Sequence, residues 1–357
     1  MSLRVVHVEG DGQRRGLQAG VAMADLIHRS LGFYRRFLRR RGVTPEDLPR
    51  RLEPHRDAAK AAYPDLVDEI AAMARGAGVE FWELFAANAW EELEPALEPV
   101  PAPADRCTGV VVGTPEGGTV LAHDEQWYAG DAGCVAVVVA RPDDGPAFVS
   151  PTVASFLPAV GMNASGMAQS VMSLTADDDR VGIPRLLVSR SALQAADRED
   201  AVRRATVEGR AGGYAHLFAG GGGGGGGEAF VVETSATDHR VLDGVTGHTN
   251  HYLDPDLAKG DGNHGPGTRT RLARARELAA ASSTVDDAMA ILHDHQAGAL
   301  SICAHPQERD GDEAESILFA MVCHVEEGRM WVAPGNPCIT PFTEIDVRAA
   351  LGRERAS

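Results

Sequence analysis

The chain changes character at Cys107. Before this residue, apolar positions recur at helical spacing, and after it short β-branched runs predict strands. The segment 94–106 joins the two regions and cannot continue a helix, because it contains Pro95, Pro99, Pro101 and Pro103. We expect this segment to be an extended, exposed connector. Cys107 therefore marks the boundary between a mostly helical region and a region rich in strands.

The order of the remaining elements predicts the layers of the fold. After an initial strand at 3–8, helices are expected at 16–40, from Pro64 to the Gly76-Ala77-Gly78 stop, and at 81–90. Beyond Cys107, strands are expected at 110–112, 119–123, 133–140, 147–150, 153–160, 167–174, 214–219, 229–233, 239–242, 315–324 and 329–333. Helices are expected at 184–208, 268–281 and 285–295. Two blocks of strands with paired helices predict two stacked sheets covered by helices, and the glycine tract 220–227 predicts a mobile hairpin loop.

Cys107 allows two interpretations from the residues alone. It can be a nucleophile that attacks the carbonyl of Arg106, moves that acyl group from nitrogen to sulfur and leaves a thioester for water to open. The new N-terminal α-amine, whose usual pKa is about 7.7–8.0, could then take the proton of its own thiol. Alternatively, Cys107 is a small buried side chain at the start of a core strand, because free cysteine is among the most buried residue types.

Composition narrows the class of protein. A chain of 357 residues can form one large structural unit, and its formal net charge of −17 argues against binding nucleic acid. The N-terminus lacks the apolar core of a signal peptide, and we see no stretch apolar enough to span a membrane. The five cysteines form no C-x-x-C pair, so neither a disulfide framework nor a zinc ribbon is indicated. We expect a reducing, cytoplasmic location.

No metal site and no cofactor site are predicted. The histidine pairs His248 with His251 and His293 with His295 lack a third ligand at recognisable spacing. A His-Asp-His run at a helix end more often compensates the helix dipole. Core packing is the favoured interpretation for Cys134, Cys303 and Cys323, and Cys338 is left unassigned.

Several segments, in shared order and spacing, resemble the acyl-coenzyme A:6-aminopenicillanate acyltransferase family, a peptidase C45-like branch of the N-terminal nucleophile hydrolases. The segments that carry the resemblance are 62–70, 74–79, 88–93, Cys107-Thr108, 121–127, 161–166, 182–185, His248-Thr249-Asn250-His251 and Ser301-Ile302-Cys303. Single fragments are weak signals, but the resemblance extends over nearly the whole chain. It makes Cys107 the favoured nucleophile.

The resemblance implies an α+β fold, a four-layer αββα sandwich with a mostly helical N-terminal segment. It also implies self-cleavage between Arg106 and Cys107, which would divide one compact unit into an α chain of residues 1–106 and a β chain of residues 107–357. Asn250 matches the family asparagine whose amide helps to form the oxyanion hole. Without the flanking match, Asn250 would be interpreted as a turn residue at a strand end.

Two departures from the family pattern affect the predicted site. Relatives often have His-Asn-Glu-Asp-Trp where this chain has His123-Asp124-Glu125-Gln126-Trp127, so the usual aspartate is replaced by Gln126. Asp124 is the candidate to orient the terminal amine in its place, and the alternative is that the amine is tuned differently in this chain. Ala304 stands where relatives commonly carry arginine after Ile-Cys, which removes a candidate clamp for a carboxylate or phosphate.

The sequence therefore predicts an enzyme that hydrolyses a small-molecule amide, or transfers its acyl group, through a thioester on Cys107. Asn250 and Asp124 complete the predicted catalytic set. We expect the α and β fragments to stay associated, and homo-oligomerisation is left open. The alternative is a non-catalytic, unprocessed relative that acts as a small-molecule binding or assembly protein. The substrate, the acceptor and any requirement for coenzyme A are not fixed by the residues.

Overall fold

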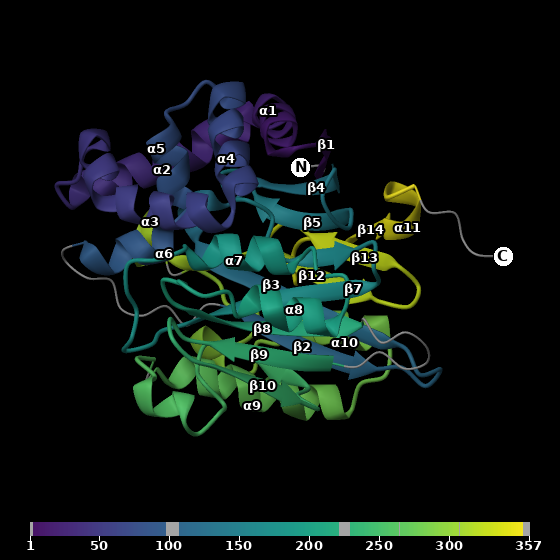
Figure 1. Ribbon diagram of the computed structural model, residues 1–357. Helices are drawn as coiled ribbons and strands as arrows, with labels where there is room; N and C mark the ends of the chain where they lie inside the picture. The colour runs from purple at the N-terminus through teal and green to yellow at the C-terminus, as the bar shows by residue number, and fades with distance from the viewer. Residues whose placement is uncertain (1–2, 98–106, 221–228, 264, 307, 353–357) are drawn as a thin grey trace.

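The computed structural model describes residues 3–97, 107–220, 229–263, 265–306 and 308–352 (Figure 1). Its N-terminal part contains β1 (Arg4–Gly10), α1 (Gly12–Ala22), α2 (Ala24–Arg40), α3 (Leu48–Ala62), α4 (Pro64–Ala77), α5 (Phe81–Asn88) and α6 (Trp90–Leu93). The strands that follow are β2 (Thr108–Gly113), β3 (Thr119–Tyr128), β4 (Val135–Pro142), β5 (Phe148–Val153), β6 (Gly161–Asn163), β7 (Met167–Leu174), β8 (Gly213–Gly220), β9 (Ala229–Thr234), β10 (His239–Asp243), β11 (Gly247–His248), β12 (Glu315–His324), β13 (Arg329–Ala333) and β14 (Thr343–Asp346). The later helices are α7 (Arg185–Ala192), α8 (Arg198–Ala205), α9 (Pro266–Ala280), α10 (Val285–Leu292) and α11 (Val347–Ala350).

Two sheets stack face to face between layers of helices. One has the strand order β1-β4-β5-β6-β7-β8-β9-β10 and the other β11-β2-β3-β12-β13-β14. Helices α7 and α8 pack on β8 and β9 of the first sheet, whereas α9 and α10 pack on β2, β3 and β12 of the second. The N-terminal helices gather at the β1–β4 end of the first sheet (Figure 1). These layers are the predicted αββα sandwich.

Both faces of the central strands are buried. On β2, Val111 belongs to the core between the sheets, whereas Val110 and Val112 pack with Ile291 and Leu292 beneath α9 and α10. Strands that are covered on both sides are apolar throughout instead of alternating. This is why short apolar runs located β4, β8, β12 and β13 within a few residues.

The segment predicted as one helix over 16–40 is two helices, because helical geometry is interrupted at Met23. Helix α1 lies very close to α4. A Cβ added at Gly16 would stand 2.0 Å from the carbonyl oxygen of Glu69, and one added at Gly20 would stand 2.2 Å from the carbonyl oxygen of Met73. Only glycine allows this approach. The contact also brings Arg15, which is 1% exposed, to 2.7 Å from the carboxylate of Glu69.

The strand predicted over 153–160 is wrong beyond its first residue. β5 ends at Val153, and the next paired residues are those of β6, which begins at Gly161. The apolar side chains between the two strands, including Phe156 and Leu157, line a pocket instead of pairing in the sheet. A ligand-facing apolar segment and a core strand have the same composition.

The predicted division of the chain falls at the edge of the described residues. Most of the connector and Arg106 lie outside them, as does the glycine tract beyond Gly220. Glu94 and Leu97, at the start of the connector, are buried and not exposed as expected. β1 pairs in parallel with β4, so the N-terminal segment contributes an edge strand to the first sheet. Among the described residues, no helix has both the length and the apolar character needed to cross a membrane.

Candidate active site

Cys107 directly precedes β2, which lies between β11 and β3 in the second sheet. Thr108 pairs with Asp124 on β3, and Gly109 pairs with His248 on β11. Continued beyond these pairs, the two antiparallel registers set Glu125 on one side of Cys107 and Asn250 on the other. The strand order therefore brings together residues that are distant in sequence.

Strand alternation separates the neighbours of Cys107 into two faces. Cys107 belongs to the core between the sheets, and His123 reaches Ser170 of β7 in the opposite sheet. Glu125 shares this face and lines the same pocket as Cys107. Ala122, two residues before Asp124, packs on the helical side. Asp124 therefore lies on the face of β3 opposite to the Cys107 thiol.

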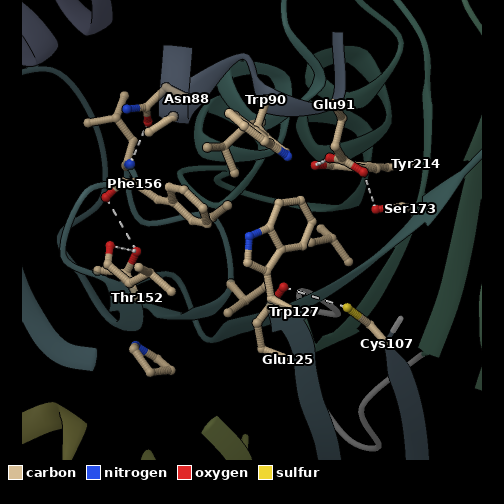
Figure 2. Close-up of a pocket in the computed structure, with 18 of the residues that line it drawn as sticks. Asn88, Trp90, Glu91, Cys107, Glu125, Trp127, Thr152, Phe156, Ser173 and Tyr214 are labelled. Carbon is tan, nitrogen blue, oxygen red and sulfur yellow. Dashed lines mark hydrogen bonds between the residues drawn. The ribbon is translucent and has the colours of Figure 1, made fainter. Parts of the chain in front are cut away.

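The Cys107 thiol is buried beside a carboxylate (Figure 2). It donates to Glu125 Oε1 at 3.6 Å and lies 3.9 Å from the carbonyl oxygen of Gln126. Glu125 Oε2 is 3.2 Å from His123 Nε2, and His123 Nδ1 is 2.8 Å from Ser170 Oγ. Burial, and then the charges of Glu125 and Asp124, raise the pKa of the Cys107 thiol well above its usual value. The thiol therefore needs a base before it can attack.

Asp124 supports the start of β2. Its Oδ1 accepts a hydrogen bond from the Thr108 N–H at 2.8 Å, and its Oδ2 is buried without a partner among the described residues. Burial raises the pKa of Asp124 to about 7. Gln126, which the resemblance places where relatives have an aspartate, donates through Nε2 to Glu315 Oε2 at 3.1 Å. Neither side chain has a described hydrogen bond to the Cys107 sulfur, which contacts Glu125 and the Gln126 backbone.

The raised pKa of Asp124 predicts how stability depends on pH. An unfolded aspartate loses its proton near its usual pKa of 3.8, whereas the folded chain retains the proton up to about pH 7. Between these values the folded state binds more protons, so this group lowers the free energy of unfolding as pH rises. The free energy of unfolding should fall by up to about 1.4 kcal/mol per pH unit through this group. We expect Asp124→Asn to remove that decline.

The measurement is urea unfolding across this pH window, in a Cys107→Ala background so that cleavage does not intervene. The free energy of unfolding of the Asp124→Asn variant should increase relative to its parent as pH rises. Asp286→Asn, at an exposed position, is the matched control. Parallel pH profiles for Asp124→Asn and its parent would show that Asp124 ionises as it does in the unfolded chain.

The side chain of Asn250 is held in one orientation. Arg271 Nη2 donates to its Oδ1 at 2.9 Å, and guanidinium groups can only donate, so the amide NH₂ must point the other way. That NH₂ donates to the carbonyl oxygen of Ser173 at 3.1 Å, and Ser173 lines the pocket. The backbone N–H of Asn250 donates to Thr268 Oγ1 at 2.8 Å. These bonds use one of the two amide N–H groups and fix the direction of both.

The pocket beside Cys107 has largely apolar walls. It holds about 650 Å³, a volume that includes its open mouth, and its lining includes Trp90, Trp127, Phe156, Leu157 and Val160. Trp127 donates through Nε1 to Tyr34 OH at 2.8 Å, which fixes the indole against α2. Trp90 Nε1 is buried and has no partner among the described residues. A donor without a partner at a pocket wall is available to a bound molecule.

Acidic residues lie at another part of the pocket wall. Glu91 accepts hydrogen bonds from the hydroxyl groups of Ser173 and Tyr214 (Figure 2). Burial, followed by the charge of Glu91, raises the pKa of the Tyr214 phenol well above its usual value. The neighbouring Glu92 accepts from Arg185 Nε at 2.9 Å in a buried ion pair. Both carboxylates therefore have protein partners.

Sequence reasoning did not assign a role to Glu125, Glu91, Tyr214 or Trp90. Glu125 lies two residues after His123, so strand alternation alone would have placed it on the same face as that histidine. Glu91 and Trp90 belong to the segment 88–93, which resembles the family. Tyr214 carries no signal in sequence, because only the pairing of β7 with β8 brings it beside Ser173.

Comparisons with solved structures give distant similarities. A variant of conjugated bile acid hydrolase from Clostridium perfringens is 12% identical, with a TM-score of 0.44, over 70% of this chain and 95% of that chain. Penicillin V acylase from Agrobacterium tumefaciens is 16% identical, with a TM-score of 0.40, over 64% of this chain and 83% of that chain. No curated protein sequence matches the chain.

A protein-family comparison gives a direct assignment. The model of the family described as acyl-coenzyme A:6-aminopenicillanic acid acyl-transferase matches residues 114–338, which is more than half of the 357 residues. The match includes β3 with Glu125 and the segment with Asn250, and it begins shortly after Cys107. The chain belongs to the acyl-coenzyme A:6-aminopenicillanic acid acyl-transferase family and is an enzyme of the amide-hydrolysing or acyl-transferring kind.

Proposed function

We propose that this chain is a self-processing cysteine enzyme that forms a thioester with the acyl group of a small-molecule amide. The observation that carries the proposal is the position of Cys107. This residue heads a central strand, its thiol contacts a carboxylate, and it lines an apolar pocket. A nucleophile beside a base and next to a substrate-sized cavity is the arrangement that acyl transfer needs.

Processing comes first in this proposal. Glu125 accepts the proton of the Cys107 thiol, and the sulfur attacks the carbonyl carbon of Arg106. The C–N bond breaks as the Cys107 nitrogen takes up a proton, which leaves a thioester between Arg106 and the Cys107 sulfur. Water opens this thioester, giving a carboxylate at Arg106 and a free amine and thiol at Cys107. The distance of 3.6 Å between Glu125 Oε1 and Cys107 Sγ supports Glu125 as the base.

Turnover then uses the new terminus. The α-amine takes the thiol proton, the thiolate attacks the amide carbonyl, and the departing amine receives that proton. The second N–H of the Asn250 amide donates to the developing oxyanion, since the first is bonded to Ser173. Asp124, which already accepts from the Thr108 N–H, orients the adjacent amine. Water as the second acceptor gives hydrolysis, whereas an amine gives acyl transfer.

The acyl group fits the apolar part of the pocket. Burying each methylene contributes about 0.8 kcal/mol, so kcat/KM should rise about fourfold per methylene until the pocket is filled. We expect this for a series of N-acyl amides with lengthening acyl chains. Acid quenching during turnover should add the mass of the acyl group to the fragment that begins with Cys107, and hydroxylamine should remove it. Labelling of Cys338, the half-exposed cysteine, in place of Cys107 would contradict the proposal.

The two fragments remain associated in this proposal, because β1 of the first is paired along its length with β4 of the second. We also propose a cytoplasmic location. All five cysteines are free in the structure, and a reducing compartment keeps a nucleophilic thiol active.

A further inference from the structure

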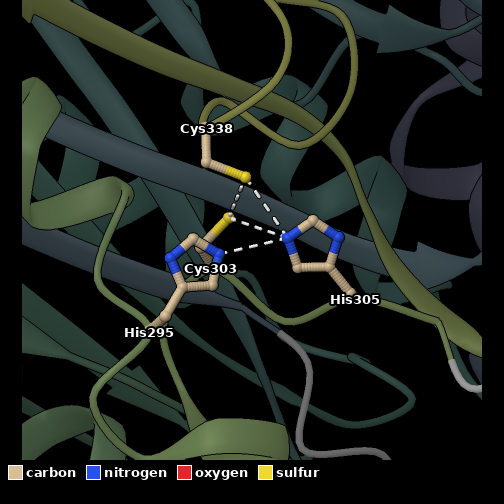
Figure 3. A group of neighbouring side chains, drawn as sticks. All are labelled: His295, Cys303, His305 and Cys338. Carbon is tan, nitrogen blue, oxygen red and sulfur yellow. Dashed lines mark hydrogen bonds between the residues drawn. The ribbon is translucent and has the colours of Figure 1, made fainter.

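Four side chains from three separate segments converge on one point outside the active site (Figure 3). His295 follows α10, Cys303 and His305 lie before β12, and Cys338 lies in the loop between β13 and β14. One nitrogen or sulfur atom from each side chain lies within 4.8 Å of all the others. We refer to these four residues as the His₂Cys₂ cluster.

The separations within the cluster resemble the edges of a small tetrahedron. Cys303 Sγ is 3.6 Å from Cys338 Sγ, and the Nε2 atoms of His295 and His305 are 3.1 Å apart. His305 Nε2 is 3.2 Å from Cys338 Sγ and 3.9 Å from Cys303 Sγ. A tetrahedral Zn²⁺ with Zn–S of about 2.3 Å and Zn–N of about 2.0 Å would give edges of about 3.8 Å (S to S), 3.5 Å (S to N) and 3.3 Å (N to N).

Hydrogen bonding alone does not account for this convergence. His305 Nε2 faces another ring nitrogen and two sulfur atoms, although one ring nitrogen can donate or accept only one strong hydrogen bond. Thiols are weak donors and weak acceptors, so hydrogen bonds to the two sulfur atoms would hold the four side chains together only weakly. A cation at the centre satisfies all four atoms at once.

Groups around the cluster support the same interpretation. Asn336 Nδ2 lies 3.7 Å from Cys303 Sγ and donates to the Ala304 carbonyl oxygen at 2.6 Å. Its Oδ1 accepts from Ser316 Oγ, at the start of β12, at 3.3 Å. An N–H group directed at a ligand sulfur, itself held by a further hydrogen bond, is typical of the outer shell of metal sites.

We propose that the His₂Cys₂ cluster binds one Zn²⁺ as a closed structural site. Two thiolates and two imidazoles suit zinc and not the hard cations Mg²⁺ and Ca²⁺, which prefer oxygen ligands. Four protein ligands leave no open position for catalysis. The ion fastens the loop between β13 and β14 to the segment that follows α10, beside the helical layer that covers the second sheet.

This proposal departs from the sequence expectation of no metal. Sequence analysis paired His293 with His295 and assigned Cys303 to core packing. In the structure His293 stacks on Phe342, whereas His295 turns to His305. Cys303 is 1% exposed, as expected for a packed residue, but its sulfur faces the cluster. Cys303 and Cys338 are separated in sequence by β12 and β13, so their spacing resembles no familiar zinc motif.

The test is metal analysis of the full chain, purified under reducing conditions without chelator. We expect about one Zn²⁺ per chain, and replacement by Co²⁺ should give the thiolate charge-transfer and tetrahedral d–d absorption bands. His305→Gln and Cys338→Ser should reduce bound zinc to near zero and remove these bands. His239→Gln and Cys134→Ala, which change the same residue types elsewhere, should retain both.

Three results would overturn the proposal. One is wild-type chain that carries no zinc and shows no tetrahedral cobalt spectrum after Co²⁺ is added. Another is recovery of Cys303 and Cys338 as a disulfide in chain kept reduced and supplied with zinc throughout. The last is equal zinc content in wild type, His305→Gln and Cys338→Ser. Because the wild-type cobalt spectrum requires no variant, poor folding of a variant does not leave the proposal untested.

Discussion

Replacing Cys107 with alanine is expected to give one uncut chain without detectable turnover, whereas the wild type is recovered as two fragments divided between Arg106 and Cys107. The sulfur performs both reactions in the proposed mechanism, and alanine offers no other nucleophile at the head of β2. Loss of a catalytic nucleophile removes most of an enzyme's rate enhancement, a factor of about 10⁶ in a well-studied protease. Intact-mass spectrometry measures the cleavage, and amide turnover measures the activity.

Two further variants make this result specific. Cys134→Ala changes another buried cysteine and should be cut normally. Glu125→Gln retains the shape of the side chain that contacts the thiol but removes the base, so cleavage should slow by about 10²-fold or more. If Glu125→Gln is cut at the wild-type rate, another group takes the proton. If the wild type itself stays uncut, the non-catalytic binding or assembly protein becomes the better interpretation.

The second large effect is expected at Asn250. Removing one preorganised oxyanion donor costs about 10²–10³ in kcat, because the donor bonds the charge that develops only in the transition state. We expect Asn250→Ala to lower kcat by this factor with little change in KM. The fixed orientation of the amide, with Arg271 on its oxygen, is the reason to expect the upper part of the range.

Asn250→Asp provides the matched comparison, because it retains the size and the acceptor but replaces the donor with a charge. Arg271 would then face a full carboxylate, whereas the Ser173 carbonyl oxygen would lose its donor, so kcat should fall at least as far as in Asn250→Ala. Turnover is measured on chain already shown by mass to be cut, which separates slow processing from slow catalysis. An unchanged kcat in Asn250→Ala would remove the amide from the oxyanion hole.

Much of the fold follows from local pattern. β12 and β13 were predicted to the residue, and α10 begins at the predicted Val285, where the Thr284 side chain accepts from the Asp287 N–H at 3.0 Å. Errors occurred where apolar residues serve another purpose, as in the pocket-lining segment after Val153. The break at Met23 was missed because the close contact of α1 with α4 depends on a partner far along the chain.

The sequence by itself determined the two-sheet class of fold, the position of Cys107 at the head of a strand, and the family. The fold class and the position of Cys107 depend on residues that are near one another in the chain, where periodicity and turn residues predict the elements. The family follows from short segments whose order and spacing are preserved along the chain. Only the tertiary structure decided which groups meet across elements. Strand pairing and alternation set Glu125, and not Asp124, against the thiol, while the loops around β12 and β13 gathered the His₂Cys₂ cluster. Such contacts follow from sheet register and layer packing, because both act between residues that the sequence keeps apart.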